Sequence, residues 1–255
     1  MTAAGEDTVL SVTRTGDVWR LTLRRPHAGN AVDQRLADAF AATVAELVAE
    51  DEPQLVVLAS EGSQFCTGGD VTAVATAADP GAYLVRLAAT MHDALEALRA
   101  SAHIVVAAVQ GAAAGAGLAL VLNADLVVAS EQAVFLSAYA GVGLTPDCGV
   151  THLLPATVGP RRAAELTLTG RVLTAPEARD WGIVNTVVDD LSGHLDALLE
   201  QLTAGPRWAQ SRTLRLLGRD DLDFHDHLAA ELEGLAAQIA LPDTVQRLHR
   251  FIDRR

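Results

Sequence analysis

The order of hydrophobic and polar positions along the chain predicts an alternation of strands and helices. Short continuous apolar runs, typical of buried parallel strands, occupy residues 55–60, 104–109 and 125–130. Between them, apolar residues recur at helical spacing over 36–48 and 84–98. Strands that alternate with helices in this way indicate an α/β fold with a parallel sheet.

The two ends of the chain depart from this alternation. Residues 9–23 are typical of a hairpin, because Trp19, Leu21 and Leu23 alternate with polar residues after a turn at 15–17. From residue 161 onward the pattern is mostly helical. We therefore expect a core over 1–195 and a helical region over 196–255, whose apolar stripes could be buried against another subunit. The Ala-rich segment 71–81 reads as a loose connection.

Composition narrows the class of protein. The chain has 255 residues, a formal net charge of −13 and 50% hydrophobic residues. This charge argues against nucleic acid or an anionic membrane as a partner. All basic residues are Arg, which excludes a lysine nucleophile or Schiff base. With two cysteines, no cysteine–histidine spacing typical of zinc and no signal-peptide pattern, we expect a soluble cytoplasmic protein without a metal.

Two glycine-rich turns each follow a buried strand. Residues 67–70 come after the strand at 55–60, and residues 115–117 come after the strand at 104–109. If the strands are neighbours in one sheet, both turns lie at the same edge, and their backbone amides could converge on one oxygen. Such a pair would act as an oxyanion hole. For the stretch 107–125 alone, a glycine–alanine helix packed tightly for space explains the sequence equally well.

Several segments resemble one known family. They are RPHAGNAV at 25–32, SQFCTGGDV at 63–71, VQGAAAGAGLAL at 109–120, VGLTPDCGVTHLLPATVG at 142–159, TGRVLTAPEARDWGIVNTVV at 169–188 and FIDRR at 251–255. In content and order they resemble the crotonase superfamily, the enoyl-CoA hydratases and isomerases. The resemblance implies a crotonase-like spiral of ββα units, a C-terminal helical trimerisation region and chemistry on acyl-CoA thioesters.

The resemblance also implies where the substrate lies. The oxyanion-hole amides fall on Gly69 and Ala116. Tyr139 could donate a hydrogen bond in the pocket, although a buried structural tyrosine is an equally good interpretation. The residues expected along coenzyme A are Ala28, Gln64, Gly68, Asp70 and Val71, together with Phe251 and Arg254, whose positions often reach the coenzyme A of a neighbouring subunit.

The sequence departs from the hydratase pattern at two positions. The two glutamates that activate water in hydratases would fall at Ala119 and Tyr139, and neither residue is acidic. Asp147 instead matches the single carboxylate of several isomerases of the family. From local sequence alone, Asp147 in LTPDCG is also a good helix N-cap. His92 is on the polar side of its predicted helix, where we expect it to be solvated, and Cys66 and Cys148 read as small buried fillers.

These features lead to one main hypothesis with two alternatives. The chain is expected to shift a C=C bond in an enoyl-CoA, with Asp147 carrying the proton and coenzyme A entering only as part of the substrate. A hydratase or another lyase that uses an unrecognised group is the first alternative, and a non-catalytic acyl-CoA binder is the second. We expect a homotrimer or a dimer of trimers.

Overall fold

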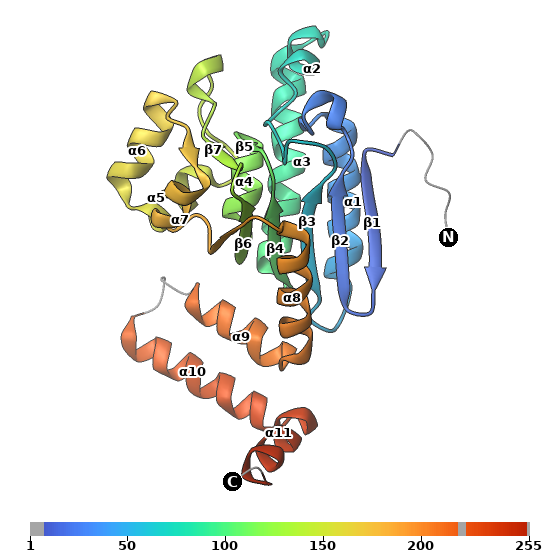
Figure 1. The fold of residues 1–255 in the computed structure, drawn as a ribbon, viewed down its shortest axis with the longest axis vertical. Coiled ribbons are helices and arrows are strands. Elements are labelled where there is room, and N and C mark those ends of the chain that lie inside the picture. Colours follow the sequence, from blue (N-terminus) through green and yellow to red (C-terminus); the bar gives the residue numbers. More distant parts are fainter. Residues whose placement is uncertain (1–7, 219–222, 254–255) are drawn as a thin grey trace.

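A six-stranded sheet forms the centre of the protein (Figure 1). The structure is a computed structural model, and it describes residues 8–218 and 223–253. The strand order is β1-β2-β3-β4-β6-β9, in which β1 and β2 are antiparallel and the later neighbours are parallel. The strands are β1 (Leu10–Thr15), β2 (Val18–Leu23), β3 (Leu55–Ser60), β4 (Ile104–Val109), β6 (Leu126–Ser130) and β9 (Thr186–Val188). The N-terminal hairpin and the parallel sheet predicted from the sequence are confirmed.

A second, smaller sheet lies beside the first, with the order β5-β7-β8. It consists of β5 (Ala112–Ala114), β7 (Val134–Leu136) and β8 (Leu173–Thr174). Isolated bridges extend the same pairing to Cys66, which is bridged to Ala113, and to Val32, which is bridged to Gly69. The chain thus repeats one unit. A strand joins the large sheet, a short extended segment then pairs with the equivalent segment of the neighbouring unit, and a helix follows. This is the ββα spiral that the resemblance implied.

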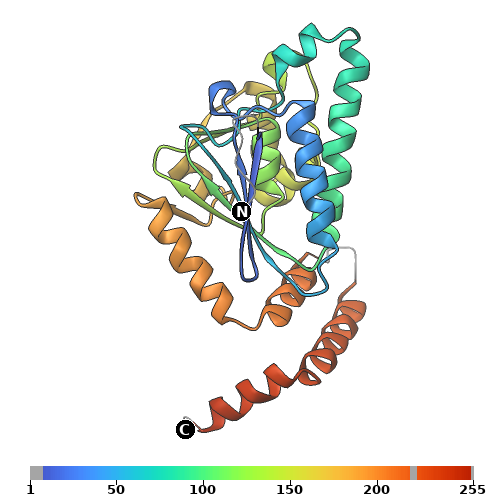
Figure 2. The same cartoon turned by 90° about the vertical axis from the view of Figure 1, so that its right-hand side faces the viewer.

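Helices cover both faces of the large sheet. Figure 2 shows α1 (Gln34–Val48) and α3 (Pro80–Ala100) on one side and α8 (Leu191–Ala204) on the other. The main core lies under α1 and α3, with Phe40, Phe65 and Phe135 among its fully buried side chains. The remaining helical elements are η1 (Pro26–Ala28), α2 (Val71–Thr76), α4 (Ala116–Leu122), η2 (Ala140–Val142), α5 (Val150–Val158), α6 (Pro160–Thr169), α7 (Ala175–Asp180), α9 (Arg207–Leu217), α10 (Phe224–Ile239) and α11 (Pro242–Asp253).

The segment 71–81 is not the loose connection that we expected. Residues 71–76 form α2, because the Asp70 carboxylate accepts a hydrogen bond from the Ala73 amide and caps the helix. The Asp79 carboxylate caps α3 in the same way, through the Ala82 amide. The alanine-rich segment shows little apolar periodicity, so the sequence pattern did not reveal Asp70 and Asp79 as N-caps of two helices.

The predicted division at residue 195 falls inside α8. Leu195 and Leu199 of this helix are buried in a second core cluster, against Val57 and Val106 of the large sheet. Beyond α8, the chain turns through α9 into α10 and α11, which extend away from the sheet (Figures 1 and 2). The division into a spiral core and a helical region remains a prediction. Within the described residues, no helix has the length and apolarity needed to cross a membrane.

One backbone contact joins α4 to the turn that follows β3. A methyl group placed on Gly117 would lie 2.1 Å from the Cys66 carbonyl oxygen, whereas one placed on Gly141 meets nothing within 4 Å. Only a glycine in α4 allows the turn to approach this closely.

We expect Gly117→Ala to lower the free energy of unfolding by about 1–3 kcal/mol. The reason is that the Cys66 carbonyl must move, and the better helix propensity of alanine does not offset the displacement. Denaturant unfolding measures the change, with Gly141→Ala as the control variant. Equal stability of Gly117→Ala and the wild type would contradict the tight packing.

Candidate active site

The two glycine-rich turns lie directly against each other. Their strands, β3 and β4, are parallel neighbours, so both turns emerge at the same edge. The Cys66 amide donates to the Ala112 carbonyl at 3.0 Å, and the Ala114 amide donates to the Cys66 carbonyl at 2.9 Å. Backbone hydrogen bonds therefore hold the segment after β3 against β5, immediately before α4.

Gly68 and Gly115 meet at the centre of this contact. A methyl group placed on Gly68 would lie 3.2 Å from the Ala114 carbonyl oxygen and 3.7 Å from Cα of Gly115. Both glycines also have positive φ values, of 107° and 51°. This is a conformation that side-chain-bearing residues rarely adopt. Close approach and backbone conformation therefore both require glycine at these two positions.

The amides of Gly69 and Ala116 lie on either side of this contact. Around Gly69, Val32 donates to the Gly68 carbonyl at 2.7 Å and accepts from Asp70 at 2.9 Å, so the amide of Gly69 itself is directed away from this pairing. Ala116 is the first residue of α4, where backbone amides have no partner within the helix. In the part of the chain that the structure describes, neither amide donates to a protein acceptor.

Tyr139 connects Asp147 to the second glycine turn. The Tyr139 hydroxyl donates to Oδ1 of Asp147 at 2.6 Å. A methyl group placed on Gly115 would lie 3.9 Å from Cζ of the Tyr139 ring. The ring itself is half-buried against the main core. Tyr139 is thus a packed tyrosine whose hydroxyl fixes the carboxylate near the start of α4, and a hydrogen bond from it to a substrate stays a prediction.

The interpretation of the Asp147 side chain as a helix cap is wrong. The cap of α5 is Gly149, with a φ of 83°, and no side chain caps this helix. Only the carbonyl of Asp147 takes part, by accepting from the Val150 amide at 3.0 Å. Because Cys148 and Gly149 both have positive φ, the chain turns before the helix and leaves the carboxylate on the side of Tyr139.

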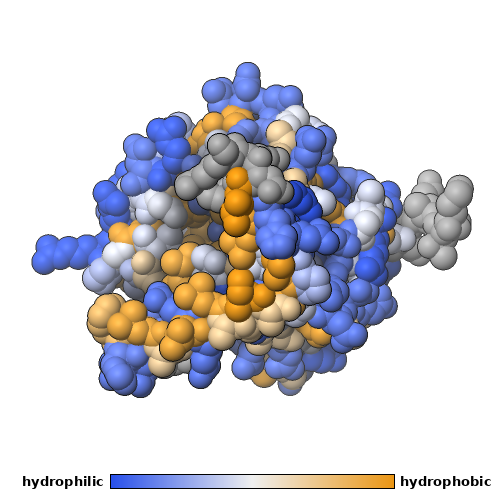
Figure 3. Space-filling view, turned by 90° about the horizontal axis from the view of Figure 1, so that it is seen from below, coloured by the Kyte–Doolittle hydropathy of each residue, from blue (hydrophilic) through white to orange (hydrophobic). Residues whose placement is uncertain are grey.

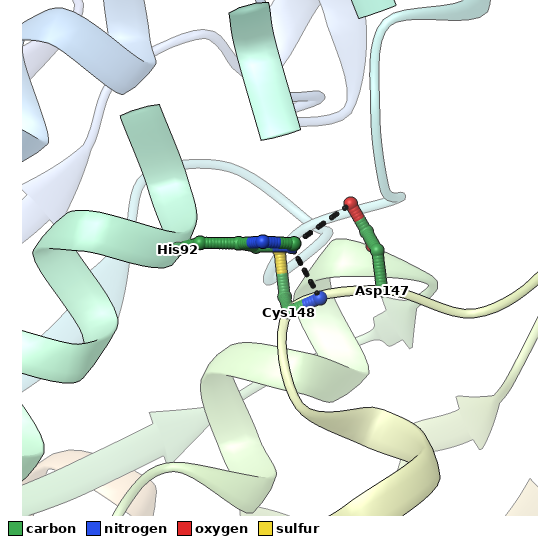
Figure 4. Close-up of side chains that lie close together, drawn as sticks. All are labelled: His92, Asp147 and Cys148. Atoms are coloured by element: carbon green, nitrogen blue, oxygen red, sulfur yellow. Dashed lines mark hydrogen bonds and ion pairs between the residues drawn. The ribbon is translucent and has the colours of Figure 1, made fainter. Parts of the chain in front are cut away.

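His92 is a site residue that the sequence reasoning missed. It belongs to α3, its side chain is 49% exposed, and its Nε2 lies 3.8 Å from Oδ2 of Asp147 (Figure 4). The same nitrogen accepts a hydrogen bond from the Cys148 amide at 3.0 Å. In this arrangement His92 is the neutral tautomer that carries its proton on Nδ1. The polar helix face on which it lies gave no signal of a partner 55 residues later in the chain.

The electrostatics of the site keep its other polar groups neutral. Burial and the nearby Asp147 carboxylate raise the pKa of Tyr139 above its ordinary value, and the same two causes raise the pKa of Cys148. Burial raises the pKa of the Cys66 thiol to about 11. Both cysteines are free and buried, as expected for small fillers, and a thiolate nucleophile is not favoured at either position.

The expected coenzyme A positions are brought together around the first turn. Asn30, two residues after Ala28, donates to the Gln64 carbonyl at 2.7 Å. The Gln64 side chain accepts from the Ala112 amide at 2.7 Å, so it connects the two turns. Gly68, Asp70 and Val71 follow directly, and Val71 is 54% exposed at the start of α2.

Of the two remaining predicted positions, the structure describes the backbone of one. Phe251 belongs to α11, at the lower end of Figure 1 and away from β5 and α4, and its side chain is not among those described. Arg254 lies outside the described residues.

Arg25 links the caps of two helices beneath the site. Its guanidinium contacts Asp70 at 2.9 Å and Asp33 at 3.1 Å, and it also donates to the Ala31 carbonyl. Asp33 caps α1 and Asp70 caps α2. Burial alone would raise the pKa of Asp70, but the Ala73 amide and Arg25 outweigh it and hold this pKa below its ordinary value.

Comparison with known proteins places the chain in a family. Residues 13–229 match the family model of enoyl-CoA hydratase/isomerase. The chain is 36% identical to the 1,2-epoxyphenylacetyl-CoA isomerase of Escherichia coli over 178 residues, which are 68% of this chain and 67% of that protein. It is 29% identical to 4-chlorobenzoyl coenzyme A dehalogenase-2 of Arthrobacter over 254 residues, which are 98% of this chain and 92% of that one.

Solved structures agree with this assignment. The enoyl-CoA hydratase of Mycobacterium smegmatis superposes with a TM-score of 0.89 at 30% identity, covering 98% of both chains. The chain therefore belongs to the enoyl-CoA hydratase/isomerase family and has the crotonase fold. Its relatives include hydratases, isomerases and dehalogenases.

We expect Arg25→Met to lower the free energy of unfolding by about 3 kcal/mol, because it leaves two largely buried carboxylates unpaired. Arg24→Met is the control, since among the described residues Arg24 pairs only with the exposed Glu61, and its loss should cost at most about 1 kcal/mol. Denaturant unfolding at neutral pH compares the two variants, and equal losses would contradict the role of Arg25.

The same experiment has a predicted pH dependence. The folded-state pKa of Asp70 is depressed, so its contribution is complete above the unfolded value of about 4 and is lost as the pH falls through the folded value. The difference between the wild type and Arg25→Met should therefore shrink in acid.

Proposed function

We propose that this protein is an enoyl-CoA isomerase, which moves a C=C bond through the enolate of a coenzyme A thioester. The observation that carries the proposal is the Asp147 carboxylate, held by Tyr139 beside the turn from which α4 begins. A carboxylate over an enolate can remove a proton from one carbon and return it to another. No cofactor other than the coenzyme A of the substrate is required.

The amides of Gly69 and Ala116 serve in this proposal as the oxyanion hole. Both lack protein acceptors within the described residues, and the turns that carry them are in contact through Gly68 and Gly115. The thioester oxygen gains negative charge as the enolate forms. Losing one fixed donor to such an oxygen typically raises the barrier by about 3–4 kcal/mol. Backbone donors explain why glycine and alanine suffice here.

The two carboxylate oxygens of Asp147 have different roles in this proposal. Oδ1 accepts the Tyr139 hydrogen bond, which fixes the orientation of the carboxylate. Oδ2 lies on the side of His92, and the side chain is 31% exposed, so this oxygen can reach a substrate. Coenzyme A would pass Ala28, Gln64, Gly68, Asp70 and Val71, and Phe251 and Arg254 would come from a neighbouring subunit.

The test uses 3-hexenoyl-CoA in D₂O, with deuterium incorporation followed by mass spectrometry. Asp147→Asn should slow exchange and isomerisation at least about 100-fold, because the amide cannot accept the proton. Binding of the thioester, measured by calorimetry, should stay within a few-fold of wild type. Tyr139→Phe is the matched variant. It keeps the Asp147 carboxylate but removes the hydrogen bond that orients it, so we expect a smaller loss of exchange and isomerisation rate than in Asp147→Asn.

Two outcomes of this assay would count against the proposal. Unchanged exchange in Asp147→Asn would remove this residue from the mechanism. Thioester binding without exchange in the wild type would favour a non-catalytic binder. Crotonyl-CoA serves as a further substrate; loss of its conjugated absorbance would indicate a hydratase, which Ala119 and Tyr139 argue against.

Hydrolytic dehalogenation of an aryl-CoA thioester is a second candidate, and the position of His92 favours it. A carboxylate can attack a ring carbon that carries a halogen, so that halide leaves and an aryl ester of Asp147 forms. Nε2 of His92 lies 3.8 Å from Oδ2 and accepts from the Cys148 amide. Once it gives up that hydrogen bond, it could take a proton from the water that attacks the ester carbonyl. A relative that matches 98% of this chain carries the name of such an enzyme.

Substitution of His92 separates the two candidates. An isomerase needs only the carboxylate, so His92→Gln should leave deuterium exchange within about tenfold of wild type. A dehalogenase should release chloride from 4-chlorobenzoyl-CoA, and His92→Gln should then accumulate a covalent adduct detectable by intact-protein mass spectrometry.

We further propose that the chain assembles as a homotrimer or a dimer of trimers. Apolar side chains stand exposed on the two C-terminal helices, and Figure 3 shows orange surface on the lower end of the molecule, where these helices lie. We define the α10–α11 apolar face as Leu228, Leu232, Leu235, Ile239, Val245, Leu248 and Ile252. Stripes of this kind at helical spacing require a partner. We place the protein in the cytoplasm, as its two unpaired cysteines suggest.

We expect Leu232→Asp/Leu235→Asp to convert the oligomer to monomers in analytical ultracentrifugation, because the variant places two charges in an apolar contact. These side chains are 67% and 68% exposed within one chain, so the fold of the subunit should survive. Val85→Asp is the control, since Val85 is 70% exposed on α3, outside this face. A wild type that is monomeric would refute the proposal.

A further inference from the structure

We propose that His92, Asp147 and Cys148 form a binding site for a soft divalent cation such as Zn²⁺. The three side chains offer one nitrogen, one oxygen and one sulfur, and these ligand atoms lie within 4.8 Å of one another. Figure 4 shows them converging from α3 and from the segment that precedes α5. The existence of this site does not depend on the reaction proposed above.

The spacing suits a single small ion. Zinc bonds to nitrogen or oxygen are roughly 2.0–2.2 Å long, so two of them can span at most about 4.4 Å, and only when they point in opposite directions. Nε2 of His92 and Oδ2 of Asp147 are 3.8 Å apart, which is inside this limit. A thiolate bond is longer, at about 2.3 Å, so it spans at most about 4.5 Å with a second ligand. The three ligand atoms, which lie within 4.8 Å of one another, would therefore draw together around the ion.

Two of the three ligand atoms must give up a hydrogen bond or a proton before they can hold an ion. Oδ1 of Asp147 is occupied by the Tyr139 hydroxyl, which orients the carboxylate and leaves Oδ2 for the metal. Nε2 of His92 carries no proton in the present arrangement, since it accepts from the Cys148 amide. On binding, the metal replaces that hydrogen bond, metal–nitrogen, metal–oxygen and metal–sulfur bonds form, and the thiol proton of Cys148 leaves to solvent.

The donor set and the access to it define the class of ion. Thiolate and imidazole favour zinc and similar soft ions, and they discriminate against magnesium and calcium, which prefer oxygen. Entry is open on one side, because the His92 side chain is 49% exposed and that of Asp147 is 31% exposed. A three-ligand site leaves a fourth position for water.

An ion in this site would act as a reversible inhibitor. The ion would bind Oδ2 of Asp147, the oxygen that accepts the substrate proton in the proposed reaction. This consequence rests on the proposed function, whereas the binding of the ion does not.

Titration with Co²⁺ tests the site directly, because cobalt replaces zinc and gives absorption bands that zinc lacks. We expect the full-length protein to bind one equivalent with a thiolate-to-cobalt charge-transfer band in the near ultraviolet. Zn²⁺ should displace the cobalt, and Mg²⁺ or Ca²⁺ in excess should not. No substrate is present, so failure of the isomerase proposal leaves this measurement intact.

Variants assign the ligands. Cys148→Ser should remove the charge-transfer band, and His92→Gln should keep the band but weaken cobalt binding at least about tenfold. His92 is half-exposed on α3, so its variant keeps the test valid even if Cys148→Ser does not fold. Two controls match them: Cys66→Ser removes the other thiol, and His227→Gln removes a histidine that faces Glu231 on α10.

Several results would overturn the site. They are the absence of a thiolate band in the wild type, a band that survives in Cys148→Ser, and a band that is lost in Cys66→Ser. Cobalt affinity that falls in His227→Gln rather than in His92→Gln would place the ion on α10 instead.

Discussion

The structure depends on one backbone contact, that between the turn after β3 and the segment from β5 into α4. Carbonyl and amide groups of Cys66 pair with Ala112 and Ala114, and Gly68 meets Gly115 with no side chain between them. This contact joins two layers of the spiral at the edge where the parallel strands end. It also leaves the amides of Gly69 and Ala116 without protein acceptors in the described part of the chain. The candidate site thus lies where two successive layers of the spiral meet.

A second constraint places the acid. The chain between β7 and α5 contains left-handed residues that are not glycine, and each is adjacent to Tyr139 or Asp147. Ala138 precedes Tyr139 with a φ of 61°, and Cys148 follows Asp147 with a φ of 51°. Such conformations are costly and persist where the surrounding structure holds them. Here the left-handed conformations of Ala138 and Cys148 direct the Tyr139 hydroxyl and the Asp147 carboxylate toward each other, near the start of α4.

The polar groups around the first turn have a different task. Arg25 ties the caps of α1 and α2 together, and Gln64 ties one turn to the other. These side chains are largely used by the protein itself, so any contact they make with coenzyme A comes on top of a structural role. The side chains around Asp147 are engaged less completely by the protein itself. The side chains of His92 and Asp147 are partly exposed, and Oδ2 of Asp147 is left to different chemistries, whereas Nε2 of His92 accepts from the Cys148 amide.

The sequence by itself determined the large parallel sheet, its N-terminal hairpin and the positions of the two glycine-rich turns. These features depend on local periodicity and on residues with unusual backbone freedom, both of which are visible in a short window. It also determined the family, through motifs in a fixed order. Tertiary structure alone decided the second sheet, because strands as short as β5, β7 and β8 have too few residues to show a period. Only the tertiary structure also showed that Asp147 does not cap α5 and that His92 lies beside it, since the first depends on the left-handed turn at Cys148 and Gly149 and the second on a contact across 55 residues of the chain.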